Sequence, residues 1–155
     1  MNILNLMLWH LGKFYNMKMK IGFTSGVFDL FHIGHLNILK RAKKHCDILI
    51  VAVTNDKLAF KLKNKKPVIP FKERCEIVRS IKFVDKVVEE KFDDKLLAKK
   101  KYNFDIIFKG DDWKNSKKWE ILKKEFKKSK TKVVFLKYTK NTSSTLIRKV
   151  CEKIN

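Results

Sequence analysis

The sequence contains little glycine, proline, cysteine or arginine, and no apolar run in its body is long enough to cross a membrane. Five glycines and two prolines among 155 residues argue against long disordered linkers. The three cysteines, Cys46, Cys75 and Cys151, form neither a CxxC pair nor a metal-ligand pattern, which fits free thiols in a reducing cytosol. We therefore expect a cytoplasmic protein without structural disulfides, long enough to bury the core of one domain.

The scarcity of arginine decides how the large positive charge is interpreted. The formal net charge is +21, yet arginine occurs only at positions 41, 74, 79 and 148. A basic surface attracts nucleic acid. A sequence-specific nucleic-acid-binding protein would, however, be expected to use arginine, which forms bidentate hydrogen bonds to phosphates and to guanine edges. The lysines fall mainly on predicted helix faces and in loops, where solvated charge is ordinary. We therefore predict no specific nucleic-acid partner, with a basic nucleic-acid-binding module as the alternative from another class of protein.

Residues 1–17 differ from the rest of the chain. Their apolar run ahead of Lys13 is too short for a transmembrane helix and lacks the basic start and small-residue cleavage site of a signal peptide. Met17 and Met19 stand directly before the first clear strand. Residues 1–17 are interpreted as an N-terminal extension, either a start codon placed too early or a short appended helix. Residues 18–155 are interpreted as a single domain, and no membrane insertion is expected.

From residue 18 onward, short β-rich runs alternate with helical patterns. Residues 47–54 are almost wholly apolar and β-branched, as expected of a strand that is covered on both faces. The predicted strands are 20–25, 47–54, 84–88, 105–109 and 132–136. The predicted helices are 33–44, 71–81, 93–101, 116–127 and 143–154. This alternation predicts a Rossmann-like, doubly wound α/β fold, with a parallel sheet of about five strands and helices on both faces.

Ligands of such sheets bind beyond the carboxyl ends of the strands, where the strand order reverses. Of the segments that this rule singles out (25–35, 54–66, 109–116 and 137–145), the first carries the clearest chemistry. Gly26 follows a strand and lets a phosphate approach the backbone. His32 and His35 can both face one phosphate at the positive end of the next helix, and Gly34 permits its tight start. The plain alternative, one buried and one surface histidine without a joint role, fits this arrangement poorly.

The run from Gly26 to Leu39 (GVFDLFHIGHLNIL) resembles the GxFDxxHxGH signature of the nucleotidyltransferase superfamily that includes the cytidylyltransferases. The resemblance continues through 53–56, 71–74, 84–85, the GDDW run at 110–113, and 142–145, and it covers the chain from Lys20 onward. Within the superfamily, the order and spacing of these motifs resemble the glycerol-3-phosphate cytidylyltransferases.

The resemblance implies a reaction and partners. It implies transfer of CMP from CTP to a small phosphorylated alcohol, foremost glycerol 3-phosphate, which gives CDP-glycerol and pyrophosphate. It also implies Mg²⁺ bound with the triphosphate, and a homodimer. Two alternatives stay open: an adenylyltransferase of the same superfamily, and a cytidylyltransferase for choline, ethanolamine or another polyol phosphate. A catalytically inert nucleotide sensor is disfavoured by the presence of both histidines.

The resemblance also implies roles for individual positions. Catalytic roles fall to His32, His35 and a lysine after the second strand, for which Lys63 is the first candidate and Lys61 the second. Nucleotide binding is implied for Gly26, Val27, Phe28, Asp29, Gly34, Asp111, Thr139, Ser143, Ser144 and Thr145. Support of the acceptor or of the structure is implied for Lys61, Arg74, Asp85, Asp112 and Trp113. The motifs imply no protein residue as a fixed metal ligand.

The last segment departs from the family motif RTxGISTT. Tyr138 stands at the arginine position of this motif, and Asn141 stands at the glycine position. Asparagine tolerates the left-handed backbone that glycine supplies, so the second change is mild. A phenol does not replace the planar donor fork of arginine. We therefore expect Tyr138 to stack on the nucleotide base and Arg148, one turn into the last helix, to supply the missing charge.

Overall fold

In the computed structural model, which describes residues 18–140 and 142–153, five parallel strands form one sheet in the order β3-β2-β1-β4-β5. The strands are β1 (Ile21–Gly26), β2 (Ile48–Thr54), β3 (Lys86–Glu90), β4 (Ile106–Gly110) and β5 (Lys132–Leu136). The central strand β1 pairs with both β2 and β4. The chain runs outward from β1 to β3 and then crosses to the other side of β1, so the strand order reverses between β1 and β4. A ligand crevice is expected at the carboxyl ends of these two strands.

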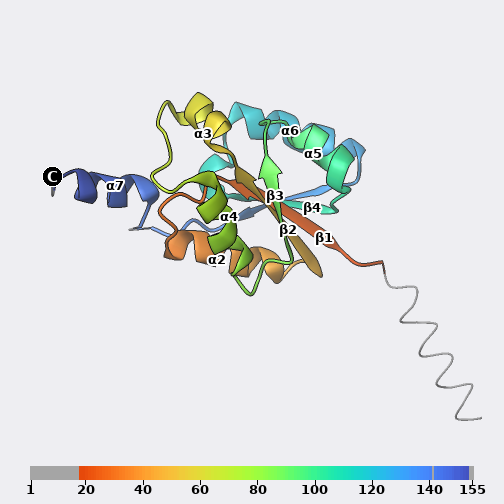
Figure 1. The fold of residues 1–155 in the computed structure, drawn as a ribbon. Helices are drawn as coiled ribbons and strands as arrows, with labels where there is room; N and C mark the ends of the chain where they lie inside the picture. The colour runs from red at the N-terminus through yellow and green to blue at the C-terminus, as the bar shows by residue number, and fades with distance from the viewer. Residues whose placement is uncertain (1–17, 141, 154–155) are drawn as a thin grey trace, which may run out of the picture.

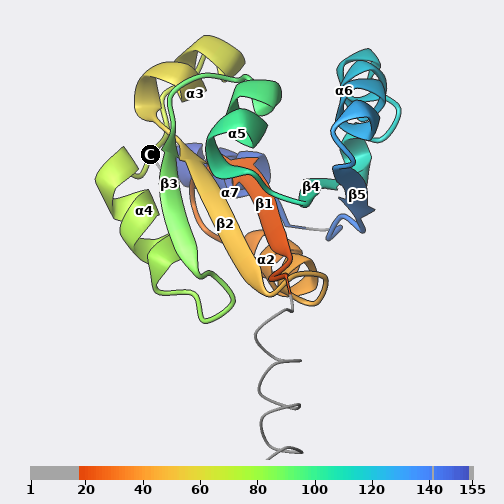
Figure 2. The same cartoon turned by 90° about the vertical axis from the view of Figure 1, so that its right-hand side faces the viewer.

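Helices cover both faces of the sheet (Figures 1 and 2). They are α2 (Ile33–Lys43), α3 (Asp56–Lys63), α4 (Phe71–Arg79), α5 (Lys95–Tyr102), α6 (Lys117–Lys128) and α7 (Ser144–Glu152), with a short 3-10 turn η1 (Asp111–Trp113) after β4. On one face, α2 and α4 bury Leu39 and Val78 against the sheet. On the other face, α6 buries Trp119 and Phe126. The predicted doubly wound α/β fold is confirmed.

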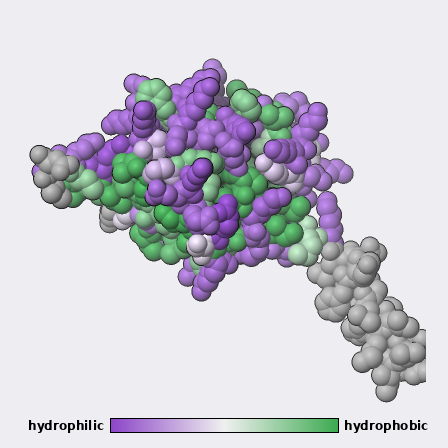
Figure 3. All heavy atoms as spheres, in the orientation of Figure 1, coloured by the Kyte–Doolittle hydropathy of each residue, from purple (hydrophilic) through white to green (hydrophobic). Residues whose placement is uncertain are grey.

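The surface reflects the lysine-rich composition. Figure 3 shows hydrophilic residues over much of one face of the molecule, with hydrophobic residues visible between them. The helix α7 has no buried residue, and Figure 1 shows it beside α2 and α4 at the edge of the molecule. No helix in the described part of the chain is long and apolar enough to cross a membrane. The interpretation of residues 1–17 lies outside the described residues.

One helix was not predicted. The segment 54–66, identified only as a strand-end segment, contains α3, which begins after Asn55 and ends at Lys63. The Asn55 side chain accepts a hydrogen bond from the Leu58 amide at 2.8 Å and so caps the helix. Asn64 ends it in the left-handed conformation, with a φ of 50°. The helix is only eight residues long, and its apolar residues Phe60 and Leu62 are exposed, so it was not distinguished from a loop.

Candidate active site

A cavity of about 510 Å³ opens at the carboxyl ends of β1 and β4. Its volume lies within the usual range for sites that hold small molecules and cofactors. The turn between β1 and α2, the end of α3, the segment around η1 and the start of α7 line it. The predicted site residues that line it are Gly26, Val27, Phe28, His32, Gly34, His35, Lys63, Asp112, Trp113, Tyr138, Thr139, Ser143, Ser144 and Thr145. The fold thus gathers residues from four separate segments around one space.

The two histidines of the first motif lie together at the start of α2. His32 is the N-cap of the helix, and its Nδ1 accepts a hydrogen bond from the Gly34 amide at 3.0 Å. The His32 and His35 rings stack with their centroids 4.0 Å apart. A Cβ atom on Gly34 would lie 2.8 Å from Cε1 of His32, so a larger residue at this position would displace the His32 ring. Both imidazoles therefore stand at the positive end of the helix dipole.

Both imidazoles are neutral at physiological pH. Burial lowers the pKa of His32. Burial and the nearby His32 and Lys63 lower the pKa of His35 to about 3, against the opposing effect of Asp29. Within 18–140 and 142–153, Nδ1 of His35 is the one buried side-chain nitrogen or oxygen without a hydrogen-bond partner. Two neutral rings can stack without charge repulsion and can still donate hydrogen bonds to a phosphate.

The turn that carries the histidines has an uncommon backbone. Phe28 and Leu30 adopt left-handed conformations with φ of 55° and 46°. Side chains larger than glycine or asparagine seldom occupy this region, and each such residue costs of order 1 kcal/mol or more. The turn must therefore be held in place by contacts with other parts of the chain. Asp29 and Arg74 provide these contacts.

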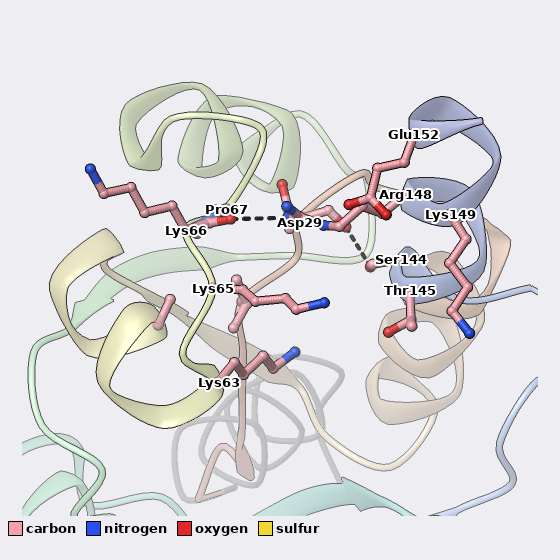
Figure 4. Close-up of a pocket in the computed structure, with 12 residues that line it drawn as sticks. Asp29, Lys63, Lys65, Lys66, Pro67, Ser144, Thr145, Arg148, Lys149 and Glu152 are labelled. Atoms are coloured by element: carbon pink, nitrogen blue, oxygen red, sulfur yellow. Dashed lines mark hydrogen bonds and ion pairs between the residues drawn. The ribbon is translucent and has the colours of Figure 1, made fainter. Parts of the chain in front are cut away.

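Asp29 joins the turn to two distant segments. Its carboxylate accepts hydrogen bonds from the Val68 amide at 3.0 Å and the Ile69 amide at 2.9 Å, and it forms an ion pair with Arg148 at 2.9 Å. The Ser144 hydroxyl donates to the Asp29 carbonyl at 2.6 Å (Figure 4). Burial alone would raise the pKa of Asp29, but these hydrogen bonds and Arg148 hold it below its usual value. The turn, the loop before α4 and the start of α7 are thus fastened together.

Arg74 also stabilises the β1–α2 turn, through contacts with three backbone segments. Its side chain is fully buried, and its guanidinium donates to the carbonyls of Ile69 at 2.9 Å, Thr54 at 2.9 Å and Val27. It also forms an ion pair with Asp56 at 2.6 Å. These carbonyls belong to the end of β2, the β1–α2 turn and the loop before α4. The structure therefore gives Arg74 a structural position, outside the residues that line the large cavity.

A smaller cavity of about 120 Å³ adjoins the large one between the loop after α3 and the start of α7 (Figure 4). Both cavities share Val27, Lys63, Ser144 and Thr145 in their linings. The smaller cavity is also lined by cationic side chains, namely Lys65, Lys66, Arg148 and Lys149. Lys63 lines both cavities and Lys61 lines neither, which favours the first of the two lysine candidates. Ammonium groups and hydroxyls beside a helix N-terminus suit a polyphosphate.

Arg148 is positioned by contacts within the chain. It lines the smaller cavity, where its Nη2 contacts Asp29 and donates to the Lys66 carbonyl at 3.0 Å. Tyr138 lines the large cavity and is 45% exposed. Its amide donates to the Asp111 carboxylate at 2.8 Å, which links η1 to the segment after β5. Asp111 therefore positions Tyr138 and is not among the residues that line either cavity.

Asp85 lies at the far end of the sheet from the site. It directly precedes β3, accepts a hydrogen bond from the Leu49 amide at 2.6 Å and pairs with Lys43 at 2.6 Å. Both β2 and β3 run from this end toward the cavity at their carboxyl ends. Asp85 is thus a structural residue, one of the two roles predicted for it.

Several charged residues of the large cavity were not selected from the sequence as site residues. Lys109 precedes Gly110 at the end of β4, and Glu90 ends β3. Glu90 forms an ion pair with Lys95 and accepts a hydrogen bond from the Thr54 hydroxyl at 2.6 Å. Lys95 also pairs with Asp93 at 2.7 Å. Their positions at strand ends follow the rule for ligand sites, but lysine and glutamate are common enough here that the rule alone did not distinguish them.

The described residues contain no group of three or more histidine, cysteine or acidic side chains that could hold a metal ion. Asp112 is the exposed carboxylate at the cavity, whereas Glu90 and Asp93 are paired with lysines. Mg²⁺ commonly binds through substrate phosphates, several waters and one or two carboxylates. These residues thus fit an Mg²⁺ ion that arrives with a triphosphate, and they do not form a cage of their own.

Comparison with known proteins agrees with this geometry. A family profile described as cytidylyltransferase-like matches residues 23–150. The chain belongs to the cytidylyltransferase-like family. It is 36% identical over 131 residues to a glycerol-3-phosphate cytidylyltransferase of Bacillus subtilis, covering 84% of this chain and 95% of that protein. A glycerol-3-phosphate cytidylyltransferase of Staphylococcus aureus is 34% identical, with 84% and 93% covered.

Solved structures show the same fold. The lipopolysaccharide core biosynthesis protein of Thermoplasma volcanium superposes with a TM-score of 0.67 at 26% identity. The superposition covers 81% of this chain and all of that one. The family predicted from the GxFDxxHxGH run is thereby confirmed.

Proposed function

We propose that the protein transfers CMP from CTP to glycerol 3-phosphate, giving CDP-glycerol and pyrophosphate. The observation that carries this proposal is the pair of neutral, stacked imidazoles of His32 and His35 at the N-terminus of α2, facing a nucleotide-sized cavity. The family and the names of the relatives support the nucleotide and the acceptor.

The reaction needs no protein nucleophile. An oxygen of the acceptor phosphate attacks the α-phosphorus of CTP and forms a new P–O bond, while the bond from that phosphorus to the bridging oxygen of the β-phosphate breaks. His32 and His35 donate hydrogen bonds to the charge that develops on the α-phosphate, and the Lys63 ammonium neutralises charge on the leaving pyrophosphate. Because the cavity holds both substrates in one place, positioning contributes much of the rate.

The proposal includes Mg²⁺ as a companion of CTP. The ion would neutralise the departing pyrophosphate, and Asp112, an exposed carboxylate in the lining of the cavity, would meet it there. The smaller cavity, with its lysines and the Ser144 and Thr145 hydroxyls, would hold the distal phosphates. Removing Mg²⁺ with EDTA is expected to abolish product formation, and adding Mg²⁺ in excess is expected to restore it.

We also propose that the protein acts in the cytoplasm as a homodimer, as the resemblance implies. Light scattering coupled to size exclusion at micromolar concentration tests the second part. A mass near 37 kDa, twice the 18.4 kDa of the chain, is expected. A mass of one chain in an active preparation would contradict the dimer.

A pyrophosphate-release screen tests the reaction. Four nucleoside triphosphates are each combined with glycerol 3-phosphate, choline phosphate, ethanolamine phosphate and other polyol phosphates, and products are identified by mass spectrometry. CTP with glycerol 3-phosphate is expected to react fastest. Highest turnover with ATP would instead favour an adenylyltransferase. Tight, steeply salt-dependent RNA or DNA binding without any pyrophosphate release would favour the nucleic-acid-binding alternative.

Single variants test the histidines. His32→Ala and His35→Ala are each expected to lower kcat by roughly 100-fold or more, because each removes a donor to the transition state. The matched control is His45→Ala, which changes an exposed histidine just beyond the far end of α2. A His32/His35 double variant with near-normal kcat would refute the mechanism.

A further inference from the structure

Lys109 is a cation of the large cavity that pairs with no acidic side chain in the described part of the chain. It is the penultimate residue of β4, and its side chain lines the cavity beside Trp113, with Nζ 4.8 Å from the centre of the indole ring. Among the residues that the structure describes, none forms a hydrogen bond or an ion pair with its ammonium group. A half-buried ammonium without a partner is costly unless something else meets it.

Four other charged side chains near Lys109 are already paired with one another, and the exposed Asp112 forms no ion pair or hydrogen bond with Lys109. Glu90 and Asp93 both contact Lys95, and Asp93 also contacts Lys118. These four side chains line the same part of the cavity from β3, the β3–α5 loop, α5 and α6. Because they neutralise one another, Lys109 is the cation of this group that is left to attract an anion.

Lys109 reaches the cavity from the opposite face of the sheet to the histidines. Side chains alternate between the two faces along a strand. Phe108 packs in the core on the α2 side, whereas Ile107 packs in the core on the α5 and α6 side, so Lys109 belongs to the latter. The histidines stand at the start of α2, and Lys63, Lys65 and Lys66 line the smaller cavity from the end of α3 and the loop after it, together with the start of α7. An in-line displacement needs the attacking and the leaving oxygen on opposite sides of the α-phosphorus, so the acceptor phosphate needs a contact of its own, away from the residues that hold the pyrophosphate.

We propose that Lys109 binds the phosphate group of the acceptor and is a specificity-determining residue for phosphorylated acceptors. The inference rests on the proposed transfer reaction, since it assigns one of the two substrates to this side of the cavity. The ammonium holds the attacking phosphate on the α5 and α6 side of β4, while the triphosphate lies against the start of α2, the end of α3 and the start of α7. The Trp113 ring covers the lysine and limits the access of water to this contact.

The protonation of Lys109 gives the proposal a pH signature. Burial and the nearby Lys95 lower the pKa of Lys109 to about 8, against the opposing effects of Glu90, Asp112 and Asp93. The side chain is therefore charged at pH 7 and loses its proton at mildly alkaline pH. The apparent affinity for the acceptor is expected to fall as the pH rises above about 8, and a bound phosphate dianion would move this limit upward.

The test separates the two substrates kinetically. Lys109→Met, Lys109→Arg and the exposed control Lys114→Met are compared with the wild type, using CTP and the best acceptor of the pyrophosphate-release screen. Lys109→Met is expected to raise KM for the acceptor roughly 10- to 100-fold, the effect of losing one charge-assisted hydrogen bond, and to change KM for CTP by less than about 2-fold. Lys109→Arg is expected to restore most of the affinity and to remove the loss near pH 8. Lys114→Met is expected to match the wild type.

Other outcomes overturn the inference in distinguishable ways. A raised KM for CTP with an unchanged KM for the acceptor would place Lys109 on the triphosphate. Unchanged values for both substrates would make the lysine a packing partner of Trp113 only. Melting temperatures are measured alongside, and a variant that melts near the wild-type temperature excludes misfolding as the cause. If the wild type releases no pyrophosphate with any pair of substrates, the proposed function fails and this inference fails with it.

Discussion

Replacing Arg74 by lysine tests whether one buried guanidinium holds the turn that carries the histidines. The guanidinium contacts three backbone carbonyls and Asp56, from planar donors that point in different directions. A lysine ammonium keeps the charge but has its three donors on one atom, so it cannot reach all four acceptors. We assume that two of the three buried carbonyls lose their hydrogen-bond donor in the variant. At about 1–3 kcal/mol for each unsatisfied group, offset in part by water, the expected loss is about 2–4 kcal/mol.

Thermal unfolding followed by circular dichroism measures this loss. For a chain of this size, 1 kcal/mol shifts the melting temperature by about 2–4 °C, so Arg74→Lys is expected to melt roughly 5–15 °C below the wild type. The matched control is Arg79→Lys, on the same helix, where the arginine is exposed and pairs with Glu76 at the surface. Its melting temperature is expected to change by less than about 2 °C. A shift for Arg74→Lys no larger than that of the control would refute the structural assignment.

Three further predictions concern the same turn. Gly34→Ala is expected to lower kcat about 10- to 100-fold with little change in melting temperature, because the new methyl group would displace the His32 ring, and steady-state kinetics measure this. Asp29→Asn is expected to lower the free energy of unfolding in urea by about 2–3 kcal/mol, because an amide cannot accept from both backbone donors and Arg148; a variant as stable as the wild type would contradict this. The pKa of His35 is about 3 in the folded protein, below the 6.5 of the unfolded chain, so the unfolded state binds the extra proton first and stability falls as the pH drops below about 6.5. The melting temperature of the wild type is therefore expected to fall further between pH 7 and pH 5 than that of His35→Asn. Equal decreases for the two proteins would contradict this prediction.

The elements of the fold were predictable where the sequence pattern is strong. Strands such as 47–54 are continuous apolar runs, because helices cover both faces of the sheet, and such runs stand out in the sequence. The short, lysine-rich helix α3 was missed because most of its side chains face solvent and only Leu58 and Ala59 are buried. An isolated helix of this length is marginal, so α3 depends on its cap and on the packing of these two side chains, which the sequence does not show.

The motif of the site was predictable from the sequence, but the long-range contacts that position its residues were not. His32-Ile-Gly-His35 could be read from residue spacing, because one helix start brings the rings together. The ion pair between Asp29 and Arg148 joins residues that are 119 positions apart, and only the folded chain shows it. The prediction that Arg148 supplies charge to the nucleotide stays a prediction, and nothing in the sequence indicated that its Nη2 also contacts Asp29. Lys109 escaped selection for a similar reason, because the lack of a partner is a property of its surroundings and not of its sequence.

The cap of α2 also fixes the chemistry of His32. Its Nδ1 accepts a hydrogen bond from the Gly34 amide, so this nitrogen carries no proton. In a neutral imidazole the proton must then reside on Nε2, which selects one tautomer before any substrate arrives. The ring can donate a hydrogen bond to a phosphate only through Nε2. A second proton could bind to Nδ1 only if the hydrogen bond from the Gly34 amide were broken. The first hydrogen bond of the helix therefore determines which nitrogen of the active-site imidazole is the donor.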